Sequence, residues 1–298
     1  MFVPLGPTAC AKLKPAMQTL VLALLLAAVF SYFSPAVQGR LQNALGRKPA
    51  LVWGLPPVLT AVFAVAAAVA GAFSLPLAAM VLVYTAAPVA AVWLGGDFAA
   101  ILLLWLPIEF NAGARFVSKN LGFLHSVAYG IAILMGLTLF LGFRKTPGMK
   151  FNLPRHARDF WLPLAGFALA APVLALLGVA IGFIPPLHWP TRTAGAMAAA
   201  SGIIFAATAL PEEILFRALI QNLLVQRFGR SARTLLLASV IFGLAHLDNG
   251  PQPLPNWRYA ILATIAGVAY GAVFQNSSTV LSSAALHTMV DWTKHFFF

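Results

Sequence analysis

Residues 199–224 read AASGIIFAATALPEEILFRALIQNLL, an apolar run that is long enough to cross a bilayer as a helix yet carries Glu212, Glu213 and Arg217. Ionisable side chains are expensive in hydrocarbon, and those found there usually face a bundle interior or a wet cavity where they carry function. The chain has only 7 Asp and Glu residues. The position of these glutamates therefore indicates most about what the protein does.

The composition around this run predicts an all-α, polytopic transmembrane helical bundle. Of the 298 residues, 61% are hydrophobic and 9% are charged. The apolar stretches are continuous rather than alternating, which favours spanning helices over a β-barrel. We expect about eight to ten spans. The apolar segments lie at 16–33, 51–73, 75–94, 98–110, 121–143, 160–183, 194–224, 234–247, 259–274 and 279–298.

The net charge of +12 reflects topology rather than a nucleic-acid surface. Its basic residues cluster in short gaps between the apolar segments, where positive charge holds loops on the cytoplasmic face. No basic stripe with interleaved aromatic residues is present, so we exclude nucleic acid as a partner. Membrane lipid is the expected partner, because basic gaps of this kind also bind anionic headgroups.

A change in composition near residues 185–193 divides the chain. We expect residues 1–190 to form N-terminal transmembrane helices that act as a scaffold or guide the substrate. Residues 191–298 contain every ionisable group that lies well inside an apolar segment. We therefore expect this last part to be the functional helical module.

The two adjacent glutamates should play different roles. Glu213 and Arg217 are four residues apart, so they share a helix face and can form an ion pair that neutralises both charges. This pair can also be purely structural. Glu212 points about 100° away from Glu213. A carboxylate in an apolar site without such a local partner suits a general base.

The motif FGLAH at 242–246 should bring an imidazole to the level of Glu212. Glu212 and His246 lie at similar distances along the chain from Arg230. Helices rise about 1.5 Å per residue, so a helical hairpin would place the two side chains at one depth. Phe242 lies four residues before His246 and can pack beside its imidazole.

The last apolar segment supplies a second imidazole and a third acid. His287 and Asp291 are four residues apart on one helix face. His287 lies about ten residues beyond the polar gap at 275–278, which puts it in the same depth band. We therefore expect polar side chains from three helices to converge.

The converging groups permit two kinds of chemistry. A carboxylate and an imidazole on one water form a general-base pair for hydrolysis, while a second histidine with an acid can stabilise an oxyanion. Alternatively, Glu212 with His246 and His287 makes a three-ligand set for zinc with one open position. The H-E-x-x-H spacing of soluble zinc proteases is absent. The sequence leaves metal dependence open.

Three motifs in this order, each on an apolar segment, resemble the CPBP family of CAAX proteases and bacteriocin-processing proteins, also called the ABI family. The resemblance covers about residues 195–295. It is carried by Glu212-Glu213-x-x-x-Arg217, Phe242-x-x-x-His246 and His287-x-x-x-Asp291.

The resemblance implies a glutamate-dependent intramembrane endopeptidase, a multi-pass protein of the bacterial inner (plasma) membrane. It implies that Glu212 and His246 activate water and that His287, with the residue at 291, stabilises the oxyanion. Glu213 and Arg217 would hold the site in shape. Many family members have Asn where this chain has Asp291, and an ionised aspartate cannot donate a hydrogen bond. Asp291 would therefore orient His287, carry a proton or bind a metal.

The expected substrate is a membrane-associated or lipidated peptide or protein tail. A proton-coupled membrane transporter could use the same acids as a relay, but the paired broken helices of such transporters are not evident. A catalytically silent immunity or scaffold protein is the third alternative. The sequence does not predict the oligomeric state.

Overall fold

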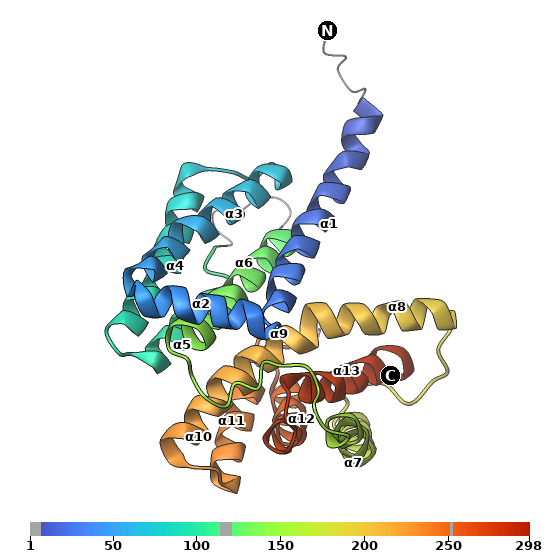
Figure 1. The fold of residues 1–298 in the computed structure, drawn as a ribbon. Coiled ribbons are helices and arrows are strands. Elements are labelled where there is room, and N and C mark those ends of the chain that lie inside the picture. The colour runs from blue at the N-terminus through green and yellow to red at the C-terminus, as the bar shows by residue number, and fades with distance from the viewer. Residues whose placement is uncertain (1–6, 114–120, 251–252) are drawn as a thin grey trace. The chain divides into compact units, whose positions relative to one another are not determined.

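The computed structural model describes residues 7–113, 121–250 and 253–298, with side chains from residue 15 onward. Every regular element within those ranges is a helix, as Figure 1 shows, and this confirms the predicted all-α bundle. The chain separates into two compact units, Met1–Pro147 and Gly148–Phe298.

The first unit is a set of helices joined by short turns. α1 and α2 meet at a bend of 82°, and Pro35 begins α2 where its missing N–H is not needed. The hydroxyl groups of Thr60 and Thr85 lie 3.3 Å apart between α3 and α4. The elements are α1 (Pro7–Ser31), α2 (Pro35–Arg47), the 3₁₀ turn η1 (Pro49–Gly54), α3 (Leu55–Ala70), α4 (Leu75–Trp93), α5 (Asp97–Glu109), α6 (Leu121–Gly136) and the π turn η3 (Leu137–Phe143).

The second unit contains all the predicted site residues. Its centre is a helical rod over residues 194–228, beside the α11–α12 hairpin, and α12 and α13 both pack on α7 (Figure 1). The elements are α7 (Arg158–Ala180), α8 (Ala194–Ile204), the π turn η4 (Phe205–Ala209), α9 (Leu210–Glu213), the π turn η5 (Ile214–Gln221), α10 (Asn222–Phe228), α11 (Ala232–Leu244), α12 (Trp257–Asn276) and α13 (Val280–Phe297).

Two π turns allow the rod to continue past Pro211. In an α-helix the proline ring would clash with the carbonyl of the residue four positions earlier, Ala207, and would remove one hydrogen bond. Ala207 lies within the wider turn η4, which directly precedes α9. π turns in helices occur mostly at functional sites. Here they flank the short segment that carries both glutamates.

Small residues allow α11 and α12 to approach closely. Gly267 and Gly271 are four residues apart on α12, the spacing of small-xxx-small helix contacts in membranes. A Cβ on Gly267 would lie 3.2 Å from atoms of Ser239 and Phe242, and one on Gly271 would lie 2.5 Å from Leu235. The close approach places the Phe242 side of α11 directly against α12.

By length and composition alone, fewer helices of the described residues qualify as spans than the eight to ten that the sequence predicts, and that count stays a prediction. Five helices in the described part of the chain meet both criteria, and the bent pair α1–α2 makes a sixth. The helices α5 and α11 have 13 residues each, about 20 Å, which is shorter than the hydrocarbon core. The rod is interrupted by π turns, and α13 carries several polar side chains.

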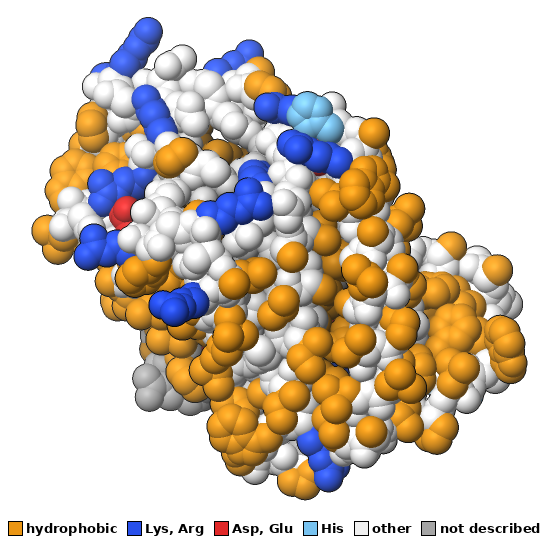
Figure 2. Space-filling view, turned by 90° about the horizontal axis from the view of Figure 1, so that it is seen from below, with side chains coloured by type: hydrophobic (Ala, Val, Ile, Leu, Met, Phe, Trp, Pro, Cys, Tyr) orange, Lys and Arg blue, Asp and Glu red, His pale blue; other side chains and the backbone are white. Residues whose placement is uncertain are grey.

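Large apolar side chains cover the surface of α7, which is expected of a helix in contact with lipid. Leu164, Leu169 and Leu176 are 60%, 77% and 73% exposed. Figure 2 shows how extensively hydrophobic side chains cover one face of the molecule. These surfaces, together with the apolar helices of membrane length, make the chain an integral multi-pass membrane protein.

A buried aspartate ties the start of α7 to the turn between α12 and α13. Asp159 is 3% exposed and accepts hydrogen bonds from the backbone N–H groups of Arg155 and His156 at 2.9 and 3.0 Å. The N–H and hydroxyl of Ser278 also donate to it, at 2.7 and 2.5 Å. Four donors therefore satisfy one carboxylate.

Lys150 also binds the turn between α12 and α13. Its ammonium donates to the carbonyls of Phe274, Gln275 and Ser277 at the end of α12, at 2.5 to 3.2 Å. Burial, with smaller effects from the nearby Arg230 and Arg158, lowers the pKa of Lys150 to about 8. The side chain therefore remains mostly protonated at neutral pH and caps the carbonyls of the helix end.

Replacing Asp159 with Ala should lower the free energy of unfolding by at least about 2 kcal/mol, because buried donors would lose a charged acceptor. Asp97→Ala is the matched control, since Asp97 forms a partly exposed ion pair with Arg144 at 2.8 Å and such pairs contribute about 0–1 kcal/mol. Denaturant or thermal unfolding in detergent micelles measures both variants. Equal losses of unfolding free energy in the two variants would contradict the structural role of Asp159.

Candidate active site

The rod places Glu213 and Arg217 as the sequence predicted. Arg217 Nε donates to Glu213 Oε2 at 3.2 Å, and both side chains have no exposed surface. Taking two charges out of water is costly unless they are paired and hydrogen-bonded. The guanidinium carbon also lies 4.8 Å from the centre of the Phe242 ring, a distance suited to a cation–π contact.

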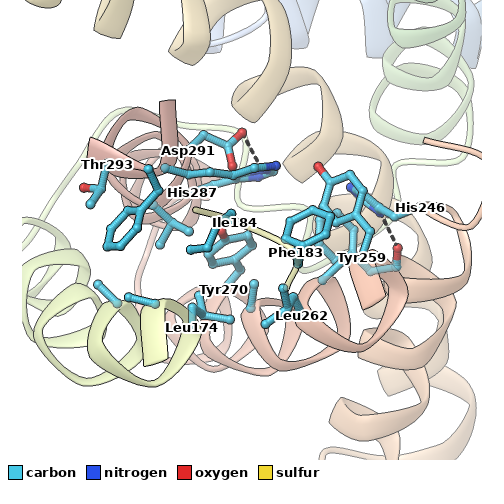
Figure 3. Close-up of a pocket in the computed structure, with 18 residues that line it drawn as sticks. Leu174, Phe183, Ile184, His246, Tyr259, Leu262, Tyr270, His287, Asp291 and Thr293 are labelled. Atoms are coloured by element: carbon cyan, nitrogen blue, oxygen red, sulfur yellow. Dashed lines mark hydrogen bonds and ion pairs between the residues drawn. The ribbon is translucent and has the colours of Figure 1, made fainter. Parts of the chain in front are cut away.

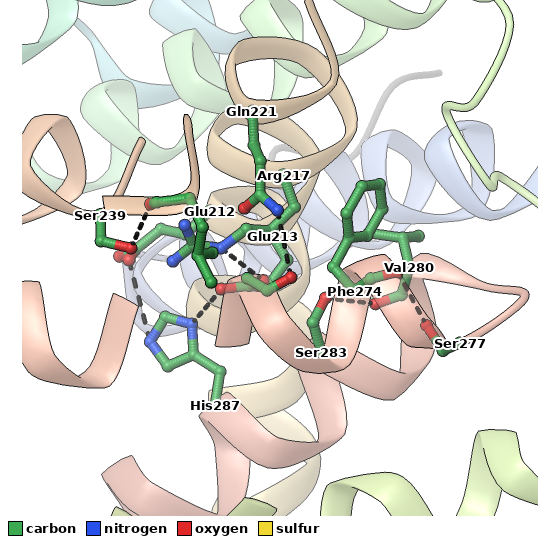
Figure 4. Close-up of polar contacts among 12 residues, drawn as sticks. Glu212, Glu213, Arg217, Gln221, Ser239, Phe274, Ser277, Val280, Ser283 and His287 are labelled. Carbon is green, nitrogen blue, oxygen red and sulfur yellow. Dashed lines mark hydrogen bonds and ion pairs between the residues drawn. The ribbon is translucent and has the colours of Figure 1, made fainter. Parts of the chain in front are cut away.

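Glu213 also binds His287, a link that the sequence did not predict. His287 Nδ1 lies 3.1 Å from Glu213 Oε1, as Figure 4 shows. A carboxylate oxygen accepts, so Nδ1–H is the donor and Nε2 faces the rest of the site. One buried carboxylate thus connects the cation of the rod to the imidazole of α13.

Aromatic rings fix the plane of His287. Tyr270 stacks on the imidazole with ring centres 4.5 Å apart and an interplanar angle of 21°. Phe242 meets it edge-on at 5.9 Å. Tyr270 and Phe242 are 1% exposed. With the ring held on both sides and Nδ1 bound to Glu213, the direction of Nε2 is set.

Glu212 lies between the two imidazoles. Its Oε2 is 3.8 Å from His287 Nε2 and 4.0 Å from His246 Nε2. Asp291 Oδ2 lies 3.4 Å from the same His287 nitrogen. The side chains of Glu212 and Asp291 are 22% and 30% exposed, whereas both histidines are buried. The predicted convergence of three helices is therefore present in the structure.

The tautomer of His246 follows from its hydrogen bond to the backbone. His246 Nδ1 lies 2.8 Å from the carbonyl oxygen of Phe242. A carbonyl can only accept, so Nδ1 carries the proton. In the neutral ring the Nε2 lone pair then points toward Glu212, which is the arrangement that a base at Nε2 requires.

A cavity opens over these groups (Figure 3). It leaves about 650 Å³ of space between its walls, the open mouth included. His246, His287 and Asp291 supply its polar side. The opposite walls are apolar and come from α7, the segment after it and α12, with Leu174, Phe183, Ile184, Leu262 and Ala266 among them. An apolar segment of a ligand can therefore reach the polar groups.

The zinc alternative finds no ready donor set in the described residues. No group of three His, Cys, Asp or Glu side chains there is arranged to hold a metal ion. The nitrogen–oxygen separations of 3.8 and 4.0 Å around Glu212 exceed the spacing of about 3.3 Å between tetrahedral ligands at 2.0 Å from zinc. Binding would require these side chains to move.

The sequence missed two aromatic residues of α12 that complete the site. Tyr270 stacks on His287, and Tyr259 packs edge-on against His246 with ring centres 4.6 Å apart. They are eleven residues apart, which places them on one face of a helix. The sequence signal that could have identified them is the presence of two tyrosines on one face of an apolar segment.

The comparison with protein families agrees with this geometry. Residues 187–293 match the family model described as type II CAAX prenyl endopeptidase Rce1-like, which confirms the resemblance seen in the three motifs. No curated protein and no solved structure matches the chain. The match covers the rod, α11, α12 and most of α13, which together carry every predicted site residue.

The adjacent glutamates should respond differently to the same substitution. Glu213→Gln leaves Arg217 buried without its counter-charge, so the free energy of unfolding should fall by about 3–5 kcal/mol. Glu212→Gln changes a partly exposed side chain and should cost less than about 1 kcal/mol. Unfolding of both variants in the same detergent tests this, and a larger loss at Glu212 would disprove the bridging role of Glu213.

Proposed function

We propose that the match of residues 187–293 to the type II CAAX prenyl endopeptidases extends to activity, and that this chain hydrolyses peptide bonds within the membrane. The substrate class is a membrane-associated or lipidated peptide or protein tail. The observation that carries the proposal is the position of Glu212 Oε2, 3.8 and 4.0 Å from two imidazole nitrogens.

Water activation is assigned to Glu212 and His246. Glu212 Oε2 and His246 Nε2 lie 4.0 Å apart, too far for a direct hydrogen bond. A water molecule between them can lie within reach of both. His246 Nε2 accepts the proton while its Nδ1–H stays on the Phe242 carbonyl. The water oxygen then bonds to the substrate carbonyl carbon, and Glu212 stabilises the developing imidazolium.

Oxyanion stabilisation is assigned to His287. Its Nε2–H can donate to the carbonyl oxygen as that oxygen gains charge, because Glu213 and Tyr270 hold the ring in place. As the tetrahedral intermediate collapses, the carbon–nitrogen bond breaks and the proton on His246 passes to the leaving amine. Asp291 orients His287 from 3.4 Å away and is a positioning residue.

The apolar walls of the cavity and the lipid-facing helices support a substrate that enters from the bilayer, in a bacterial inner membrane. A proton-coupled transporter would require a path that is open in turn to each side of the membrane. Asp291 instead lines one cavity together with two imidazoles, and Glu212 lies 3.8 and 4.0 Å from those imidazoles. This arrangement favours hydrolysis at one fixed place.

Glu212→Gln should reduce kcat/KM at least about hundredfold, because the substitution removes the negative charge that stabilises the imidazolium of His246 while keeping the side-chain size. The assay is cleavage of a fluorogenic farnesylated peptide by the purified protein in detergent. Glu109→Gln, a carboxylate of α5 outside the site, should retain activity.

Unchanged cleavage by the Glu212→Gln variant would refute the peptidase proposal. Proton uptake into vesicles that disappears in the same variant would favour the transporter. Repeating the assay of the parent protein after EDTA treatment separates the two water-activation schemes. The glutamate–histidine scheme expects activity to persist, whereas loss that added zinc restores would support a metal.

Asp291→Asn should retain activity within about tenfold, because an amide can also hold His287 at its Nε2 side. Asp291→Ala should lose more activity, because it removes the side chain of α13 that lies 3.4 Å from His287 Nε2. The comparison of kcat/KM for the two variants measures this. Equal, complete loss in both would show that the negative charge itself is required.

A further inference from the structure

The interface between the rod and α12 contains buried polar atoms that the proposed mechanism does not use. Among the described residues, no protein group forms a hydrogen bond with Arg217 Nη1, Arg217 Nη2 or Gln221 Oε1, although all three atoms are buried. Both side chains have no exposed surface. Unpaired buried polar atoms are costly, and ordered water is the usual partner where the protein supplies none.

These atoms belong to a row of polar side chains that follows the rod. Glu213, Arg217 and Gln221 succeed one another along it at intervals of four residues (Figure 4). Gln221 Nε2 donates to the carbonyl of Gly271 on α12 at 3.1 Å, so the row faces α12. Gln275 lies four residues after Gly271 on the same helix face. Its Nε2 is also buried, with no hydrogen-bond partner in the described part of the chain.

The outer end of this polar row reaches an exposed, charged surface. The rod ends at Phe228, and Arg230 in the turn that follows donates to Asn276 Oδ1 at the end of α12 at 2.8 Å. This contact is exposed, and a basic gap of this kind is expected to lie in water on the cytoplasmic face. The rod and α12 therefore run in the same direction, from the buried polar atoms to water.

The inner end of the polar row lies directly behind the catalytic cavity. The guanidinium carbon of Arg217 is 4.8 Å from the ring centre of Phe242 and 5.9 Å from that of Tyr270. Both rings line the cavity. Glu213 accepts from Arg217 and also binds His287, which lines the same cavity. One layer of side chains therefore separates the polar row from the place where peptide hydrolysis would consume water.

Water suits these atoms better than an ion does. The guanidinium repels a metal cation. An anion could accept from Arg217, but it could not donate to Gln221 Oε1, and it would add a buried net charge because Glu213 already balances Arg217. A water molecule can accept from the guanidinium and donate to the amide oxygen.

We propose that the interface between the rod and α12 holds a file of ordered water molecules, from Arg217 to the Arg230–Asn276 contact, which supplies the water consumed in the catalytic cavity. This inference rests on the proposed peptidase function. A lipidated tail would fill the open, apolar side of the cavity, so a fresh water molecule would have to arrive from another side. Passage through the last layer requires a brief movement of the Phe242 or Tyr270 ring.

A crystal structure at a resolution that shows ordered water tests for the file directly. The expected result is water density within hydrogen-bond distance of the Arg217 Nη atoms and of Gln221 Oε1. An interface that is closed by direct side-chain packing, with no such density, would overturn the inference. This measurement does not depend on cleavage of any substrate.

The variant Gln221→Met tests whether the file supplies the reaction. Methionine has a similar length but lacks the oxygen that accepts a hydrogen bond from water. The variant should lower kcat for a farnesylated peptide about tenfold and leave KM unchanged, because water is consumed after the peptide has bound. Gln42→Met is the matched control and should keep the parent kcat. Gln42 of the first unit likewise donates to a backbone carbonyl, that of Leu141, at 2.9 Å.

Unfolding of both variants in detergent separates water supply from a structural role. If Gln221 only joins the rod to α12, its loss should lower the free energy of unfolding and leave kcat of the folded protein unchanged. An unchanged kcat in Gln221→Met would therefore overturn the inference. Absence of cleavage by the parent protein would refute the proposed function instead. Cleavage by a parent protein whose interface shows no ordered water would refute the inference alone.

Discussion

The carboxylate of Glu213 is the interaction on which the rest of the site depends. It has no exposed surface and is shared by Arg217 on the rod and His287 on α13. Without it, the guanidinium of Arg217 would be buried without its counter-charge, and Nδ1 of His287 would lose its acceptor. With it, the rod and the last helix are held in one register, and Glu212, the adjacent residue in the chain, is carried to both imidazoles. The ion pair of Glu213 with Arg217 balances two charges in the interior of an otherwise apolar bundle.

Local spacing predicted the parts of the site that helix geometry alone determines. The pairs Glu213–Arg217 and His287–Asp291 follow from a separation of four residues, and both are present. The contact of Glu213 with His287 could not be predicted in this way, because it depends on how α13 is rotated against the rod. That rotation is set by side-chain packing between elements 74 residues apart in the chain. Tyr270 was missed for the same reason, since its role arises only when α12 lies beside α13.

The fold was predicted at the level of class but not of detail. Hydrophobic content predicted the all-α bundle, whereas apolar length alone did not predict which helices are interrupted or too short to meet the length criterion for a span. The π turns on either side of the glutamates have no sequence signature beyond Pro211. The close packing of α11 on α12 was visible in principle, in the glycines at 267 and 271. The chain also divides at residue 147 by packing, while the functional boundary near residue 190 remains a prediction.

The turn Phe205–Ala209 makes the orientation of α8 relative to the two glutamates depend on the exact number of residues between them. A π turn holds one more residue than the α-helical turn it replaces, so it shifts the angular phase of the helix before it by about 100° relative to the helix after it. Before it, α8 rests on α13, where Trp292 Nε1 donates to the carbonyl of Met197 at 2.9 Å. A deletion of one residue from the turn would leave the sequences of all three motifs unchanged. Either α8 would then turn away from α13, or Glu212 would turn away from the two imidazoles. Homologues with a turn of different length would still match all three motifs, although their site would no longer have this geometry.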